Sequence, residues 1–167
     1  MTEANEPGDP GYLYMNRFCG LEKYRIDSAT WNLHDYEGRP NLCIYLGSKE
    51  AIQQAEDTAE LFQRLNWELN IVEDSVSEAA LKPGFECNRP NAYEESQGGW
   101  ITNFYFVSHE GTHTNRVRIL EAKGDELLIE LSGKVLDVNF YDGSKPDSTL
   151  SAVAWFSKRP SQLRSFA

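Results

Sequence analysis

The chain has 167 residues, of which 40% are hydrophobic, 12% aromatic and 25% charged. This length and composition indicate a globular domain and exclude a disordered chain. The formal net charge of −10 disfavours binding to nucleic acids and anionic membranes, because both require clustered lysine and arginine. The acid is concentrated in residues 48–95, which contain 11 aspartates and glutamates against 4 lysines and arginines. That stretch is either a solvated surface or an acidic face that binds a basic protein partner.

The two ends of the chain differ in composition from its middle. Residues 1–11 are acidic and rich in proline and glycine, which predicts a disordered N-terminal tail without the basic and apolar regions of a secretory signal. Residues 12–157 are predicted to form a single domain, since no repeat or linker divides them. Residues 158–167 are basic and polar and are predicted to be a C-terminal tail.

The cysteines and the hydropathy indicate a cellular compartment. The chain contains three widely spaced cysteines and no CxxC pair, which excludes a disulfide framework and a metal ribbon; they are Cys19, Cys43 and Cys87. No apolar run approaches the roughly 18 residues that a membrane helix needs. We therefore expect a cytoplasmic protein with unpaired thiols and no membrane association.

Alternating apolar residues predict three strands near the N-terminus, at 18–26, 29–36 and 41–46. The strand at 41–46 is apolar on both faces, which is typical of the centre of a sheet. An amphipathic stripe then predicts the principal helix of the fold, Lys49 to Leu65, with Ser48 as its N-cap. A short strand at 67–72 is expected to lead into a long irregular segment, Phe85 to Gly99.

The C-terminal third reads as a series of short strands separated by Gly, Asp and Pro, at 101–108, 116–122, 126–132, 134–141 and 149–157. Gly133 is expected to separate the third of these strands from the fourth. The predicted fold is mainly β: an antiparallel β-sandwich of about seven to nine strands with one packed α-helix. A flattened barrel is the alternative.

One segment, His109-Glu110-Gly111-Thr112-His113, contains the H-E-x-x-H letters of zinc proteases. That chemistry needs a helix that places both histidines on one face. Here strand-like residues flank the segment and Gly111 disfavours a helix by about 1 kcal/mol. A second interpretation is a hairpin that reverses at Glu110-Gly111 and brings the two histidines together as ligands of a divalent ion.

Other polar residues carry weaker hints of chemistry. Arg116 and Arg118 share a strand face and could grip a carboxylate or phosphate, although a solvated face is the commoner reading. Asp137, Asp142 and Asp147 surround a loop that could bind calcium, but Asp and Gly are also ordinary turn residues. No cysteine has an obvious histidine partner, and no nucleotide-binding motif is present.

From these features we predict a non-catalytic binding module for a basic protein partner. The anchors of that interaction are expected on the acidic, aromatic segment before residue 101, with the ligand-binding residues Tyr93, Glu94, Glu95 and Trp100. The alternative is a metal-dependent hydrolase that uses the His109–His113 segment, with His109, Glu110 and His113 as metal ligands. An open cavity between the sheets would instead favour a small-molecule ligand.

Overall fold

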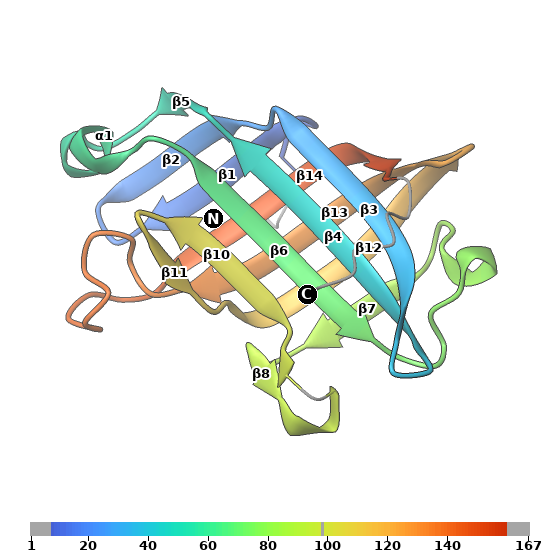
Figure 1. Cartoon of the computed structure of the whole chain (residues 1–167). Coiled ribbons are helices and arrows are strands. Elements are labelled where there is room, and N and C mark those ends of the chain that lie inside the picture. Colours follow the sequence, from blue (N-terminus) through green and yellow to red (C-terminus); the bar gives the residue numbers. More distant parts are fainter. Residues whose placement is uncertain (1–7, 98, 160–167) are drawn as a thin grey trace, which may run out of the picture.

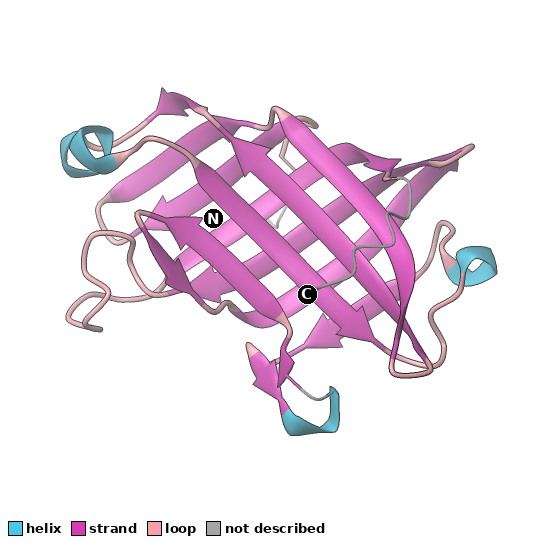
Figure 2. Cartoon of the chain, in the orientation of Figure 1, coloured by secondary structure: helices cyan, strands magenta, loops and turns pink. Residues whose placement is uncertain are grey.

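The computed structural model describes residues 8–97 and 99–159, and this part of the chain is mainly β, as predicted. Strands account for nearly all of its regular structure (Figure 2). The helical elements among the described residues are the α-helix α1 (Glu56–Leu61) and two short 3-10 turns, η1 (Glu78–Ala80) and η2 (Glu95–Gln97). The predicted N-terminal tail, residues 1–11, and C-terminal tail, residues 158–167, lie mostly outside the described residues.

The strands of the N-terminal half are β1 (Tyr12–Arg17), β2 (Gly20–Arg25), β3 (Ser28–Tyr36), β4 (Arg39–Ser48), β5 (Glu50–Gln53) and β6 (Leu65–Val72). The strands of the C-terminal half are β7 (Glu86–Arg89), β8 (Tyr93–Glu94), β9 (Gly99–Trp100), β10 (Thr102–Phe106), β11 (Ser108–Glu110), β12 (His113–Lys123), β13 (Glu126–Val135) and β14 (Ser148–Lys158).

Twelve of these strands belong to one sheet rather than to the two separate sheets that we predicted. The sheet runs in the order β11-β10-β6-β4-β3-β14-β1-β2-β5, and β13, β12 and β7 branch from β14. Within the described residues, hydrogen bonding does not close the sheet into a ring. Figure 1 shows that β10, β6, β4 and β3 form a layer that crosses in front of β1, β14, β13 and β12. The sheet therefore folds over itself around a common core.

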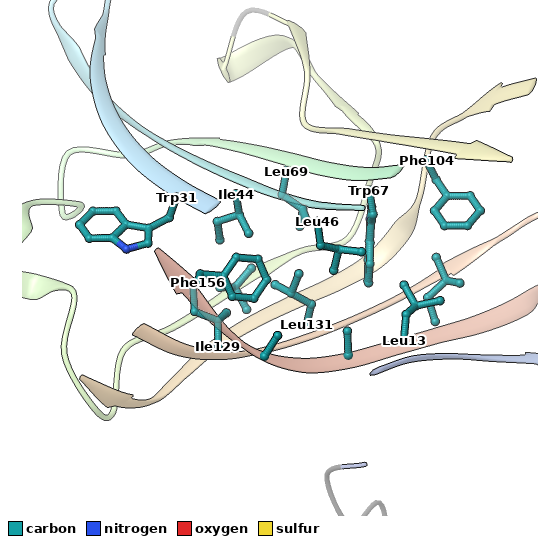
Figure 3. Close-up of a cluster of buried hydrophobic side chains, with 14 of the residues drawn as sticks. Leu13, Trp31, Ile44, Leu46, Trp67, Leu69, Phe104, Ile129, Leu131 and Phe156 are labelled. Carbon is teal, nitrogen blue, oxygen red and sulfur yellow. The ribbon is translucent and has the colours of Figure 1, made fainter. Parts of the chain in front are cut away.

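The core lies between these two layers. Leu46, Leu69 and Trp67 project from β4 and β6 toward Phe156 and Leu131 on β14 and β13 (Figure 3), and all five side chains are buried. Burial of large apolar side chains at alternate strand positions contributes about 1.5–3 kcal/mol for each side chain. The expectation that residues 41–46 form a central strand is confirmed, because β4 lies between β3 and β6.

The predicted helix over Lys49 to Leu65 is wrong in most of its length. Residues 50–53 form strand β5, which pairs with β2, and only Glu56–Leu61 are helical. The N-cap of α1 is Ala55 rather than Ser48, which lies buried at the end of β4. The expected apolar stripe is not a single buried helix face, because Ile52 is 44% exposed and Leu65 is buried as the first residue of β6. Backbone pairing with β2 has overridden the helical pattern here.

Gly133 does not separate two strands, because β13 continues through it to Val135. A Cβ at this position would lie 2.8 Å from Asn115 Oδ1 and 3.1 Å from Trp67 Cζ2. The glycine therefore allows close packing within the strand. The strand predicted at 134–141 is wrong beyond Val135: a turn follows, in which Phe140 N–H donates to the Asp137 carbonyl at 3.0 Å.

Two further findings concern the cysteines and the helices. All three cysteines are free, with Cys19 exposed, Cys43 half-buried and Cys87 buried. In the part of the chain that the structure describes, no helix has the length and hydropathy to cross a bilayer.

Candidate binding sites

Four of the predicted ligand-binding residues lie together on a small projecting hairpin. Tyr93 in β8 is directly opposite Trp100 in β9, and the ring centroids are 5.3 Å apart in an edge-to-face arrangement. Tyr93 is 48% exposed and Trp100 is 66% exposed. Figure 1 shows that the hairpin extends away from the main sheet. We call these two residues, with Glu94 and Glu95 beside them, the aromatic hairpin.

The aromatic hairpin is held at its base by hydrogen bonds and by close packing. Ile101 N–H donates to the Ala92 carbonyl at 2.7 Å. Gln97 Nε2 donates to the Asn70 carbonyl at 2.6 Å, which ties η2 to strand β6. A Cβ on Gly111 would approach the Ala92 Cβ to 2.5 Å. Gly111 therefore permits the base of the hairpin to pack closely against it, and the Trp100 ring also lies near this glycine, since the same Cβ would be 3.5 Å from Trp100 Cζ3.

The His109–His113 segment is not a helix, and it does not reverse at Glu110-Gly111. The chain reverses earlier, at Val107, whose φ is +66°, and Ser108–Glu110 then pairs with β10 as strand β11. His109 pairs across to Tyr105, whereas His113 begins β12 and pairs with Lys134 on β13. The two histidines thus belong to strands with different partners, and the predicted hairpin between them is wrong.

Buried hydrogen bonds explain why this segment is extended. Thr112 is fully buried, and its hydroxyl accepts from Trp67 Nε1 at 3.2 Å and donates to Asn115 Oδ1 at 2.6 Å. Its backbone N–H donates to Thr102 Oγ1 at 2.7 Å. Thr112 therefore anchors the segment to the core, and the segment has a packing role that its sequence letters do not indicate.

The proposed metal ligands do not converge. His113 Nε2 lies 2.7 Å from Asp147 Oδ2, and His109 Nδ1 lies 3.1 Å from Asn103 Oδ1. Across the described ranges, 8–97 and 99–159, no three histidine, cysteine, aspartate or glutamate side chains are grouped as metal ligands. The geometry therefore gives no support to a metal centre on His109, Glu110 and His113.

The remaining predicted residues are engaged in local ion pairs and turns. Arg116 pairs with Glu86 at 2.8 Å and Arg118 with Glu130 at 3.2 Å, so both guanidinium groups already have carboxylate partners.

The three aspartates around the predicted calcium loop make different contacts and do not form one site. Asp142 accepts from the Ser144 N–H in a turn, Asp147 contacts His113, and Asp137 is buried.

Sequence reasoning missed a buried ionic cluster around Arg17, the last residue of β1. Its guanidinium donates to Asp137 at 2.8 and 3.0 Å, to Asp57 at 2.8 Å through two nitrogens, and to Glu22 at 3.0 Å. The side chains of Arg17 and Asp137 are fully buried, and that of Glu22 is 1% exposed. Arg17 holds the pKa of Asp57 well below its usual range, which keeps this carboxylate ionised.

Glu22 connects the cluster to the segment before α1. Its carboxylate accepts from the Tyr24 hydroxyl at 2.6 Å, the Thr58 hydroxyl at 2.6 Å and the Ala55 N–H at 3.1 Å. Burial and the bond to Glu22 raise the pKa of Tyr24, so its phenol stays protonated. Both oxygens of this buried carboxylate thus accept hydrogen bonds, which hold α1 against β1 and β2.

An open surface pocket of about 490 Å³ adjoins the cluster. Its lining combines two aromatic rings with three acidic residues and an exposed thiol: Phe18, Cys19, Ala55, Glu56, Asp57, Glu60 and Phe140. The Phe18 and Phe140 rings meet edge to face, with centroids 5.9 Å apart. Asp57 belongs both to the pocket and to the Arg17 cluster, so the buried network supports the pocket wall.

The structure also pairs a cysteine with a histidine that the sequence did not suggest. Cys43 on β4 lies 3.5 Å from His34 Nδ1 on β3, the geometry of a nucleophile and a base. However, the thiol donates to Asn70 Oδ1 at 2.9 Å, and burial raises the pKa of Cys43 to about 12. The thiol therefore stays protonated near neutral pH, and the pair lacks the thiolate that nucleophilic catalysis needs.

Compared with known proteins, the chain matches no family model, no curated protein sequence and no solved structure at a significant level. Function must therefore be argued from the sites described above.

Proposed function

We propose that the protein is a non-catalytic binding module and that the aromatic hairpin anchors a basic protein partner. The observation that carries this proposal is the exposure of Tyr93 and Trp100 side by side on a projecting hairpin, 48% and 66% of their surface. Large aromatic residues dominate the energetics of protein interfaces, and an exposed pair of them on a projecting hairpin is the kind of anchor that such interfaces use.

The charges around the aromatic hairpin favour one kind of partner. Glu94 and Glu95 follow Tyr93 directly, and Asp74 lies nearby through its ion pair with Arg39, which also donates to the Ser96 carbonyl. Acidic side chains around an aromatic pair favour lysine and arginine on the partner, both by charge and by cation–π contact with the rings. The chain's net charge of −10 also attracts a basic partner and speeds its association.

The proposal is tested with immobilised protein and two peptide libraries of equal length, one rich in lysine and arginine and one rich in aspartate and glutamate. We expect saturable binding of basic peptides only. Trp100→Ala should weaken that binding by about 30-fold, the loss typical of an interface hot spot. Equal binding of both libraries, or unchanged affinity of the Trp100→Ala variant, would contradict the proposal.

Charge reversal supplies a second arm of the test. Replacing Glu94 and Glu95 with lysine should reduce both the association rate and the affinity for basic peptides. A matched control reverses Glu121 and Glu126, two exposed carboxylates at the hairpin between β12 and β13. If the control weakens binding as much as the hairpin variant does, the attraction comes from net charge, and the hairpin has no special role.

A further inference from the structure

We propose that the pocket between Phe18 and Phe140 binds the alkylammonium group of a small amine. This site lies beside α1, away from the aromatic hairpin (Figure 1), and it does not depend on the proposed function.

The aromatic rings of the pocket already accept an ammonium group from the protein itself. Lys145 Nζ lies 5.2 Å from the Phe18 ring centroid and 5.4 Å from the Phe140 centroid. Both distances are within the range of a cation–π interaction. Lys145 stands on the loop between β13 and β14 and is not part of the pocket lining, so a ligand cation would compete with its ammonium group for the rings.

The charges around the pocket favour a cation over an anion or a neutral ligand. Glu56 and Glu60 are exposed at its rim and have no ion-pair partner among the described residues. Asp57 adds a third carboxylate, which Arg17 keeps ionised. Behind it, Arg17 is shared among three carboxylates, so the cluster as a whole is acidic. A ligand cation would face this excess of negative charge across a short distance.

The size and the chemical lining define the ligand class. The open volume of about 490 Å³ leaves room for a small molecule, and the Phe18, Phe140 and Ala55 side chains provide apolar surface for an alkyl chain. The carboxylates of Glu56 and Glu60 provide acceptors for the N–H groups. An amine with a short alkyl chain satisfies both parts of the lining, whereas a carboxylate of the same length would be repelled.

Cys19 supplies a direct readout, because it lines the pocket and its thiol is exposed. The rate of Cys19 alkylation by iodoacetamide is measured on the intact protein with increasing butylamine, and with butyrate and butanol as controls of equal length. We expect saturable protection by butylamine alone. Protection by all three compounds, or by none, would overturn the proposal.

Variants separate cation binding from simple occlusion. Glu60→Gln should weaken butylamine binding about threefold to tenfold, as should Phe140→Leu, which keeps an apolar side chain but removes the ring. Lys145→Met should strengthen it by a similar factor, because it removes the competing ammonium group. Glu121→Gln and Lys134→Met, at exposed positions elsewhere, are the matched controls and should have no effect.

The Lys145→Met result is decisive even if a ring variant unfolds. A gain of amine affinity on loss of a positive charge is expected if the rings and carboxylates are the site. Weaker or unchanged binding in this variant would show that Lys145 does not compete for the site and would overturn the assignment.

Discussion

Replacing Arg17 with methionine tests whether the buried ionic cluster holds the fold together. The substitution removes five hydrogen bonds to carboxylates and leaves Glu22 and Asp137, which are 1% and 0% exposed, without a cation. Breaking a buried ion pair on one side costs about 3–5 kcal/mol, because the remaining charge must stay desolvated or take up a proton. Out of a typical total of about 5–15 kcal/mol, this is a severe loss.

The free energy of unfolding is measured by urea denaturation at pH 7, with Arg25→Met as the matched control. Arg25 pairs with Glu50 at 3.1 Å, but the two side chains are 50% and 61% exposed. An exposed pair of this kind contributes about 0–1 kcal/mol. A loss in Arg17→Met no greater than that in Arg25→Met would refute the argument that the Arg17 cluster is a structural centre.

A second substitution distinguishes charge from packing. In the Arg17→Met background, Asp137→Asn removes one of the orphaned charges while keeping an oxygen that can accept from Ser148. The double variant should therefore be more stable than Arg17→Met alone, although each single change is destabilising. Losses that simply add would show that the cost of Arg17→Met lies in its packing.

Three further predictions concern other parts of the molecule. Because Arg17 lowers the folded pKa of Asp57, the unfolded chain binds more protons than the folded chain below about pH 4, and stability falls as the pH drops through that range. Asp57→Asn should therefore have a lower melting temperature at pH 6 and a smaller decrease of melting temperature in acid. Iodoacetamide at pH 8 should label Cys19 rapidly in the folded protein, and the other two cysteines only in urea, as counted by mass spectrometry; a second fast thiol would contradict the burial described above. Gly133→Ala should cost about 1–3 kcal/mol in urea melts, since its Cβ would lie 2.8 Å from Asn115 Oδ1, whereas Gly99→Ala, with open space around it, should cost far less.

The strands were largely predictable because their signal is local. Large apolar residues at every second position are visible in the sequence of β4 and β6, and the inner faces that they predict are buried in the structure. The helix at 49–65 was not predictable in the same way. Its first residues form β5 because β2 offers a backbone partner about 25 residues away, which a helical pattern in the sequence does not reveal.

The sites show the same division between local and distant information. Tyr93 and Trp100 could be singled out as neighbours because they lie on one short stretch of sequence, which the structure forms into the aromatic hairpin. The Arg17 cluster could not be found, since Arg17 and Asp137 are separated by 120 positions and each looks like an ordinary surface residue in its own segment. The His109–His113 segment matches a zinc-protease motif completely in sequence, but its conformation depends on distant residues. The Thr112 hydroxyl is buried and hydrogen-bonded to Trp67 and Asn115, which keeps the segment extended.

The most direct test of the proposed binding function is a nuclear magnetic resonance titration of the labelled protein with a lysine- and arginine-rich peptide. The account predicts that chemical-shift changes concentrate on residues 93–100, including the indole N–H of Trp100, and that they vanish when Glu94 and Glu95 are both reversed to lysine. Shift changes confined to the Phe18–Phe140 pocket would place the basic ligand at the other site. That result, or the absence of any change at saturating peptide, would contradict the role of the aromatic hairpin.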